Sequence, residues 1–394
     1  MPDITLTKDQ ETALAEILQW LKIGSQPYLV IGGYAGTGKT TLVAYLRREL
    51  ATDKGWKKKK VAFCSYTGKA TSVLKTKLKE AGALLPTDSC STIHSLIYKP
   101  VLDKGGQITG WDRATTLDTD LIVIDEGSMV NALIWNDIRS FRVPILVLGD
   151  HGQLPPVEGS FNLMQQASFH LESIVRQAND NPIIRLSRHV REGGEIPFGT
   201  FGTVHKYSLA DPDAWDHFEN IVARPADEYL CICGTNRTRI GLNKRIRGLK
   251  DFESEEPQAN DRVICLKNNH AKAIYNGMIG TVKRIKKEGE HWYDAEITFE
   301  ETTRFDGRIL RYQFNQAKTL RDNGDVPVPV KEKEYGDLFD FGYALTVHKA
   351  QGSEADRVIV FEERMQLYDN DMWQRWLYTA VTRARTELYI FARG

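Results

Sequence analysis

The sequence is poor in cysteine, and its cysteines form no pattern typical of a disulfide framework. The five cysteines are Cys64, Cys90, Cys231, Cys233 and Cys265, an odd and scattered set in 394 residues. A chain of this length can bury a core large enough to fold without disulfides. The Cys231 and Cys233 pair lacks the second pair or nearby histidine that a zinc site would require. We therefore expect the cysteines to be core residues.

Long apolar segments and an excess of one charge are also missing. No run approaches the roughly 18 apolar residues of a membrane span, and charged residues precede any stretch suited to a signal peptide. We therefore expect a cytoplasmic protein with no membrane partner. Lysine plus arginine equals aspartate plus glutamate at 52 each, so no overall field would attract nucleic acid. The basic run at residues 57–60 is either a local basic surface or a solvated loop.

Short apolar runs alternate with helical patterns along the chain. Apolar runs without alternation are typical of strands buried on both faces of a parallel sheet. Two series of such runs predict two tandem α/β domains. The first series is 28–31, 61–65, 121–124 and 145–148, and the second is 229–233, 341–345, 358–361 and 388–391.

Two segments with a different pattern predict insertions. Residues 257–336 contain short alternating segments separated by glycine, asparagine and charge clusters, which indicates a small β-rich insertion. Residues 98–114 place two β-prone segments around an Asp-Lys-Gly-Gly turn, which predicts a hairpin. We therefore assign residues 1–184 to a first domain and residues 185–256 and 337–394 to a second, which the β-rich insertion interrupts.

A phosphate-binding loop is predicted between the first strand and the helix that follows it. Residues 33–40 read Gly-Tyr-Ala-Gly-Thr-Gly-Lys-Thr and fit the pattern GxxxxGK[ST]. Backbone N–H groups of such a loop surround phosphate oxygens at a helix N-terminus. Lys39 would reach the β- and γ-phosphates, and the Thr40 hydroxyl would bind Mg²⁺. The expected nucleotide-binding residues here are Gly36, Thr37, Gly38, Lys39, Thr40 and Thr41.

Two adjacent carboxylates, Asp125 and Glu126, follow the apolar run at residues 121–124. Asp125, at the carboxyl end of a strand, would hold Mg²⁺ through water. Glu126 would polarise the attacking water. Together with the phosphate loop, this pair predicts ATP and Mg²⁺ as cofactors and hydrolysis as the reaction.

Gln10 has two interpretations. Thr7 and Gln10 have the spacing of a capping box ahead of an apolar helical stripe, so Gln10 would close a helix end. Its amide would alternatively recognise adenine, which offers one donor and one acceptor on an edge.

Further short motifs follow one another along the chain. Together with Gln10, the phosphate loop and the Asp125-Glu126 pair, their order resembles that of superfamily 1 DNA helicases of the RecD-like type. Tyr66 departs from the family by replacing a proline, and Gly127 stands where a small side chain is commoner. The motifs are Tyr-Thr-Gly-Lys-Ala at 66–70, Ser-Thr-Ile-His at 91–94, Gly-Asp-His-Gly-Gln-Leu-Pro-Pro-Val at 149–157, Val-Arg-Gln at 175–177, Thr-Asn-Arg at 235–237, Thr-Val-His-Lys-Ala-Gln-Gly-Ser-Glu at 346–354 and Val-Thr-Arg-Ala-Arg at 381–385.

The resemblance implies an α/β fold of two tandem RecA-like P-loop NTPase domains. A β-hairpin would be inserted in the first and an SH3-like β-barrel in the second. ATP would lie between the domains, with Gln153 sensing the γ-phosphate. Arg176 and Arg383 would stabilise the charge that spreads over the transferring phosphoryl group. The same resemblance assigns Gly352 and Glu354 to the nucleotide site.

The resemblance also implies a channel for a single strand across both domains. Hydroxyl, amide and imidazole groups on loops suit phosphate and sugar contacts that do not read sequence. The hairpin would part the duplex, with Ile108 and Trp111 stacking on the last base pair; alternatively, Trp111 packs the hairpin base onto the domain. The residues expected to line the channel are Thr67, Lys69, Thr92, His94, Asn236, Thr346 and His348.

The sequence therefore predicts an ATP-dependent DNA helicase that moves 5′-to-3′ on single-stranded DNA and separates fork DNA. We expect a monomer that works with replication or recombination proteins. Direction and the preference for DNA rest on the resemblance alone. The alternatives are a translocase that displaces bound proteins and an ATP-gated nucleic-acid clamp. Arg176, Arg383 and the strand contacts in the second domain favour a motor.

Overall fold

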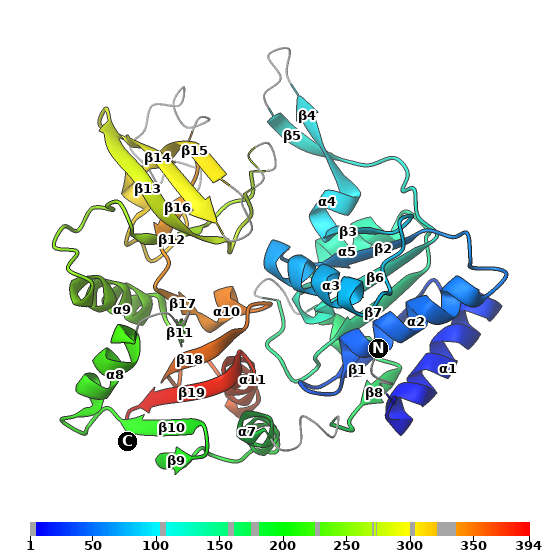
Figure 1. Cartoon of the computed structure of the whole chain (residues 1–394), viewed down its shortest axis with the longest axis horizontal. Helices are drawn as coiled ribbons and strands as arrows, with labels where there is room; N and C mark the ends of the chain where they lie inside the picture. Colours follow the sequence, from blue (N-terminus) through cyan, green and yellow to red (C-terminus); the bar gives the residue numbers. More distant parts are fainter. Residues whose placement is uncertain are drawn as a thin grey trace. The chain divides into compact units, whose positions relative to one another are not determined.

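The computed structural model describes residues 5–102, 108–156, 161–174, 181–224, 229–269, 272, 274–299, 304–320 and 336–394. The chain forms two compact units, which are described separately (Figure 1). Unit 1 comprises Met1–Gly194 with Gln374–Thr382, and unit 2 comprises Glu195–Trp373 with Arg383–Gly394.

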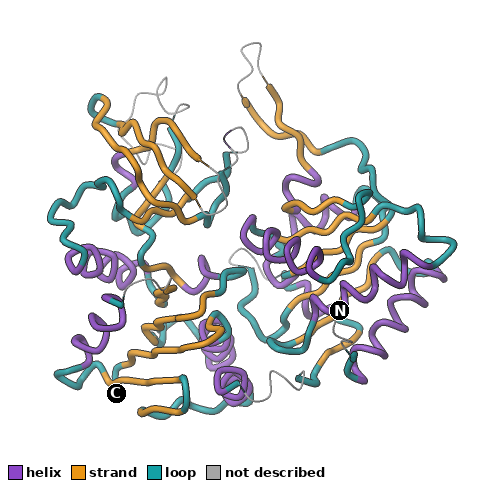
Figure 2. The backbone as a smooth tube through the Cα atoms, viewed as in Figure 1, coloured by secondary structure: helices purple, strands orange, loops and turns teal. Residues whose placement is uncertain are grey.

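Unit 1 is built on a six-stranded sheet with the strand order β3-β2-β6-β7-β1-β8, and its strand pairs are parallel (Figure 2). The prediction of a parallel sheet from the first series of apolar runs is confirmed. The strands are β1 (Tyr28–Gly33), β2 (Val61–Ser65), β3 (Ser89–Thr92), β6 (Leu121–Asp125), β7 (Ile145–Gly149) and β8 (Phe169–Leu171).

Helices cover both faces of this sheet. Helices α1, α2 and α3 pack on one face around Ile17, Leu46 and Leu74. Helices α4 and α5 pack on the other around Ile93 and Trp135. The helices of unit 1 are α1 (Lys8–Ile23), α2 (Lys39–Thr52), α3 (Gly68–Glu80), α4 (Ile93–Ile97), α5 (Ala132–Arg139) and α7 (Pro182–Arg191), joined by most of α11 (Asn370–Val381) and by the short turns η1 (Gly127–Met129) and η2 (Leu163–Gln166).

A two-stranded hairpin follows α4 and projects from unit 1 (Figure 1). It consists of β4 (Tyr98–Leu102) paired antiparallel with β5 (Ile108–Arg113). The predicted turn at residues 103–106 lies outside the described residues. At the base of the hairpin, the Tyr98 hydroxyl donates a hydrogen bond to Asp137 of α5. Trp111 is 38% exposed on the hairpin.

Unit 2 contains a second six-stranded sheet with the order β17-β11-β18-β19-β10-β9, parallel except for the edge strand β9. The same unit contains the helices α8 (Ala214–Ala223), α9 (Asn236–Leu249) and α10 (Val347–Ala350). The strands are β9 (Gly199–Phe201), β10 (Val204–Ser208), β11 (Tyr229–Cys233), β17 (Ala344–Thr346), β18 (Ala355–Glu362) and β19 (Ala384–Ala392).

The apolar run at residues 341–345, predicted as one strand, is divided between two sheets. Its start lies in β16 (Phe339–Phe341), which pairs with β12, and its end lies in β17, which pairs with β11. Gly342 lies between them, and a Cβ atom there would sit 2.9 Å from the carbonyl carbon of Val263. The chain can cross between the sheets here because glycine has no side chain.

The β-rich segment forms a five-stranded antiparallel sheet with the order β15-β14-β13-β12-β16. Its side chains join the same hydrophobic core as the parallel sheet of unit 2, since Phe341 and Val263 belong to one buried cluster with Cys231 and Phe361. The remaining strands are β12 (Arg262–Cys265), β13 (Ile279–Glu288), β14 (Trp292–Phe299) and β15 (Arg304–Leu310).

The cysteines behave as core residues, as the sequence predicted. Cys64, Cys231, Cys233 and Cys265 are buried and Cys90 is partly buried, all as free thiols. Burial raises the pKa of the Cys265 thiol to about 12, so this group stays protonated at neutral pH. None of the helices within the described ranges combines the length and apolar character needed to cross a bilayer.

Candidate functional site

The phosphate loop joins β1 to α2 in unit 1, in the context that the sequence predicted. Gly36 and Gly38 have φ angles of 79° and 74°, in a region that side chains disfavour. The Lys39 ammonium donates to the carbonyls of Gly33 at 2.7 Å and Tyr34 at 3.1 Å. The lysine therefore lies across the loop at the position where phosphates would bind.

The threonines of the loop differ in their surroundings. Thr37 is fully buried, and its hydroxyl donates to the Tyr34 carbonyl at 2.8 Å. Thr40 and Thr41 are partly buried in the first turn of α2.

Gln10 connects α1 to the phosphate loop. Its carbonyl oxygen accepts from the Thr7 N–H at 2.8 Å, and the Thr7 hydroxyl accepts from the Gln10 N–H at 3.3 Å. The capping-box interpretation is therefore confirmed. The Gln10 amide nitrogen also donates to the carbonyls of Thr37 at 2.9 Å and Gly38 at 3.3 Å. Both ends of the amide thus engage the protein, and adenine recognition stays a prediction.

The acidic pair lies at the carboxyl end of β6. Asp125 accepts a hydrogen bond from the Glu126 N–H at 3.0 Å, and Glu126 has a left-handed φ of 58°. This turn brings the buried Gly127 so close to β7 that an added Cβ atom would overlap the side chain of Val147. Glycine replaces the commoner small residue because the chain packs directly on the neighbouring strand.

Asp150 and Gln153 follow β7 and lie in a buried polar cluster. Asp150 is 1% exposed and accepts from the Gly152 N–H at 2.9 Å and from the Gln153 amide at 3.4 Å. Within the described part of the chain, the buried Gln153 Oε1 has no hydrogen-bond partner. An orphaned buried acceptor is costly, and a ligand or water that donates to it would remove that cost.

Tyr378 of α11 completes this cluster, and sequence reasoning did not identify it. Its buried hydroxyl donates to Asp150 at 2.7 Å and accepts from the Ala35 N–H of the phosphate loop at 2.9 Å. Burial and the Asp150 charge raise the pKa of Tyr378, so the phenol remains a donor. Its place three residues before the 381–385 motif was the available signal.

Two further side chains reach the phosphate loop within unit 1. The Arg191 guanidinium lies 3.5 Å from the ring centroid of Tyr34, and Tyr34 lies 4.0 Å from His151. Burial lowers the pKa of His151 to about 4, so its imidazole is neutral at pH 7. Sequence reasoning missed Arg191 because an isolated arginine at a helix end carries no motif.

The structure describes one of the two arginines that are expected to stabilise the phosphoryl charge. Arg383 is 2% exposed in unit 2 and donates to the Ser353 carbonyl at 3.3 Å. This contact brings it to the loop that contains Gly352, with a φ of 71°, and the exposed Glu354. Arg176 lies outside the described residues.

The residues of unit 1 that are expected to contact single-stranded nucleic acid lie where neighbouring β-strands end. Ser65 of β2 pairs with Thr92 of β3, which places Thr67 and Thr92 at the same edge of the sheet. Both hydroxyls accept helix N-terminal N–H groups, Thr67 from Ala70 at 3.2 Å and Thr92 from Ser95 at 3.1 Å. These threonines therefore also act as helix caps.

Lys69 and His94 extend the same edge. Lys69 lies partly buried in the first turn of α3. The His94 ring lies 5.8 Å from the ring of Tyr66 and 5.9 Å from that of Tyr98. The tyrosine that replaces the family's proline thus contributes to an aromatic cluster at this edge.

Unit 2 repeats the arrangement. Cys233 of β11 pairs with Thr346 of β17, so Asn236 at the start of α9 and Thr346 at the start of α10 share one sheet edge. The His348 Nε2 atom lies 3.1 Å from the Tyr368 hydroxyl. Burial lowers the pKa of His348, which favours the neutral imidazole.

Comparisons with known proteins agree with these features. The protein-family model for the AAA domain matches residues 5–207. The protein-family model for the UvrD-like helicase C-terminal domain matches residues 341–391. The RecBCD enzyme subunit RecD of Buchnera aphidicola subsp. Acyrthosiphon pisum (strain APS) is 35% identical, over 92% of this chain and 69% of that protein. The ATP-dependent RecD2 DNA helicase of Deinococcus radiodurans is 27% identical over 92% of this chain, which spans 46% of that relative's length.

Among solved structures, the fold is similar to that of Pif1 helicase from Bacteroides in complex with ADP-AlF3 and ssDNA. The two share 18% sequence identity with a TM-score of 0.55, over 98% of this chain and 92% of the other. The first family model covers more than half of this chain, and the Buchnera relative is similar over most of its length. The chain therefore belongs to the RecD-like superfamily 1 DNA helicases, a family of ATP hydrolases.

Proposed function

We propose that this chain hydrolyses ATP with Mg²⁺ to move 5′-to-3′ along single-stranded DNA and to separate the strands of a fork. The observation that carries the proposal is the order β6-β7-β1 in the parallel sheet of unit 1. Because parallel strands end at one edge, this order brings the acidic pair, the Asp150 cluster and the phosphate loop together.

The residues at this edge suit ATP and Mg²⁺. The left-handed glycines of the phosphate loop lie directly before a helix N-terminus, where anions bind favourably. The Thr40 hydroxyl and the Asp125 carboxylate are the oxygen ligands that Mg²⁺ prefers. A bound Mg²⁺ would neutralise charge on the phosphates.

The protein's own groups would then act in hydrolysis. Lys39 would transfer its hydrogen bonds from the loop carbonyls to the β- and γ-phosphates. Glu126 would orient and polarise the attacking water. The orphaned Gln153 Oε1 would accept a hydrogen bond from the same water, and Arg176 and Arg383 would stabilise charge that develops in the transition state.

The strand-contact residues support a motor of two domains. Each unit places its candidates at the carboxyl edge of its own parallel sheet: Thr67, Lys69, Thr92 and His94 in unit 1, and Asn236, Thr346 and His348 in unit 2. Side chains of this kind bind phosphate and sugar without regard to sequence. We propose residues 1–184 as the first motor domain and residues 185–256 with 337–394 as the second.

Two appended parts would assist strand separation. We propose that residues 257–336, which supply β12, β13, β14 and β15 of the antiparallel sheet, form an SH3-like insertion, and that the β4–β5 hairpin is the pin that meets the fork. The 38% exposure of Trp111 supports a stacking role for its ring. Replacing residues 101–110 with a Gly-Ser linker should abolish unwinding and spare DNA-stimulated ATPase, whereas wild-type unwinding by this variant would refute the pin.

A strand-displacement assay tests the main proposal. A duplex with a 5′ single-stranded tail should be unwound in an ATP-dependent reaction, and a duplex with only a 3′ tail should not. Unwinding of the 3′-tailed substrate alone would reverse the direction. DNA-stimulated ATPase without unwinding of either substrate would favour a translocase that displaces proteins.

A further inference from the structure

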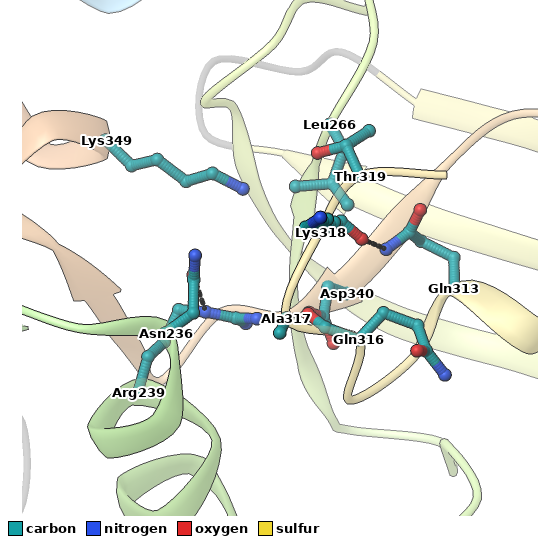
Figure 3. A pocket seen from close by; sticks show the side chains of 10 residues that line it. All are labelled: Asn236, Arg239, Leu266, Gln313, Gln316, Ala317, Lys318, Thr319, Asp340 and Lys349. Carbon is teal, nitrogen blue, oxygen red and sulfur yellow. Dashed lines mark hydrogen bonds and ion pairs between the residues drawn. The ribbon is translucent and has the colours of Figure 1, made fainter. Parts of the chain in front are cut away.

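Unit 2 contains a polar pocket of about 560 Å³, a volume in the range of ligand-binding sites (Figure 3). One side is formed by Asn236 and Arg239 of α9 and by Lys349 of α10. The opposite side is formed by Asp340 and by the loop at residues 316–319, which follows β15. The pocket thus lies between the helices of the parallel sheet and a loop of the β-rich insertion.

The acidic group in the pocket is fully satisfied by the protein. Asp340 is 1% exposed and forms an ion pair with Arg239 at 2.7 Å. Its other oxygen accepts from the N–H groups of Asn315 at 2.9 Å and Phe341 at 2.8 Å. Arg239 also donates to the Gln316 carbonyl at 2.6 Å. The Arg239–Asp340 pair therefore adds no net charge to the pocket.

The charge that remains is positive. Across the described residues, the Lys349 ammonium forms no hydrogen bond or ion pair, and Figure 3 shows its side chain extending into the pocket. Burial and the nearby Arg239 lower the pKa of Lys349 to about 8, although the Asp340 carboxylate, already paired with Arg239, acts in the opposite direction. A partly buried ammonium without an ion pair of its own is costly, and an anion in the pocket would offset that cost.

Neutral donors accompany this charge. The Asn236 side-chain oxygen accepts from Arg239 Nε at 3.0 Å, which leaves its NH₂ group as a donor on the pocket side (Figure 3). Lys318 and Thr319 line the opposite side and are exposed. An ammonium, an amide N–H and a hydroxyl around one opening favour a phosphate oxygen over a cation.

We propose that this pocket binds a backbone phosphodiester of the nucleic-acid strand, with Lys349 as counter-ion and Lys318 and Thr319 closing over it from the antiparallel sheet. This inference rests on the proposed function, since Thr346 and His348 precede Lys349 at the same sheet edge. It adds the 316–319 loop to the strand-binding surface. The antiparallel sheet would thereby hold the strand against the second motor domain.

The test measures binding of a fluorescent oligothymidylate by anisotropy across a KCl series. Each phosphate contact in a single strand contributes about 0.7 to the slope of log affinity against log salt. K349Q should therefore lower the magnitude of the slope by about 0.7 and weaken binding about tenfold or more. K318Q should also lower the magnitude of the slope and weaken binding. K286Q, which removes an exposed charge from β13 of the same unit, is the control and should change neither.

The outcomes separate this inference from the proposed function. A K349Q slope and affinity equal to those of wild type would overturn the pocket assignment. Binding of inorganic phosphate that is lost in K349Q, while K349Q binds the oligonucleotide as wild type does, would assign the pocket to a free anion and also overturn the inference. Failure of the wild-type protein to bind the oligonucleotide would instead refute the proposed function. Because Lys318 is exposed, K318Q keeps the test decisive if K349Q folds poorly.

Discussion

Lys349→Met should stabilise the protein in the absence of nucleic acid. The substitution replaces a partly buried ammonium with an apolar side chain of similar length and breaks no side-chain hydrogen bond of the described residues. The pKa of Lys349 falls from 10.5 to about 8 on folding, chiefly through burial. Each pKa unit corresponds to about 1.4 kcal/mol, which gives a cost of roughly 3 kcal/mol at most. Since the side chain keeps some contact with water, we expect a gain of roughly 1–3 kcal/mol.

The effect has a defined pH dependence. The folded-state pKa lies below the unfolded value of 10.5, so the unfolded chain binds more protons between about pH 8 and 10.5. The cost of the buried ammonium is therefore complete below pH 8 and disappears as the pH rises through 10.5. The stability difference between Lys349→Met and wild type should be largest at pH 7 and should shrink by pH 9.5.

Urea unfolding of both proteins at pH 7 and pH 9.5 measures this difference, with K286Q as the control for removal of an exposed charge. The same Lys349→Met protein should bind oligothymidylate more weakly, so stability and binding should change in opposite directions. A variant that is less stable than wild type at pH 7 would refute the reasoning. So would a stability gain that does not depend on pH.

Other substitutions test the nucleotide site. Lys39→Ala should abolish DNA-stimulated ATPase in a steady-state assay, and activity near the wild-type level would exclude this loop as the phosphate site. Arg383→Ala should lower kcat while nucleotide binding by titration stays intact, because the arginine acts on the transition state; weakened binding with normal turnover would contradict its role. Tyr378→Phe should reduce kcat/KM for ATP about tenfold, since Asp150 loses a buried donor; unchanged kinetics would limit the phenol to packing. Gly127→Ala should lower the free energy of unfolding by about 1–3 kcal/mol, because the added methyl group would overlap β7. An unchanged urea midpoint would show that β7 moves to accommodate the methyl group.

The features that could be predicted from the sequence are those that depend on a short, continuous stretch of residues. The buried strands were identified because apolar runs without alternation indicate parallel sheets, and β1, β2, β6 and β7 contain the expected residues. The phosphate loop was identified because its glycines, lysine and threonine act through a continuous segment. The capping box of Thr7 and Gln10 was one of the two interpretations of Gln10, and it could be proposed for the same reason, since a helix start depends on four neighbouring residues.

Contacts between distant segments were not visible in the sequence. The run at 341–345 is divided between two sheets because Gly342 packs on the backbone at Val263, a contact that sequence spacing does not encode. The hydrogen bonds of Tyr378 to Ala35 and Asp150 connect positions more than 200 residues apart. The hydrogen bond from the Gln10 amide to Thr37 spans 27 residues and was likewise not visible in the sequence.

The sequence by itself determined the phosphate-loop motif and most of the buried parallel strands, because both follow from residue types at short and regular spacing. Only the tertiary structure decided which polar groups are satisfied. Asp340 forms an ion pair with Arg239, whereas the Lys349 ammonium in the same pocket forms no ion pair with any of the described residues. Burial and pairing arise when separate segments pack together, so the charge of that pocket exists only in the folded chain.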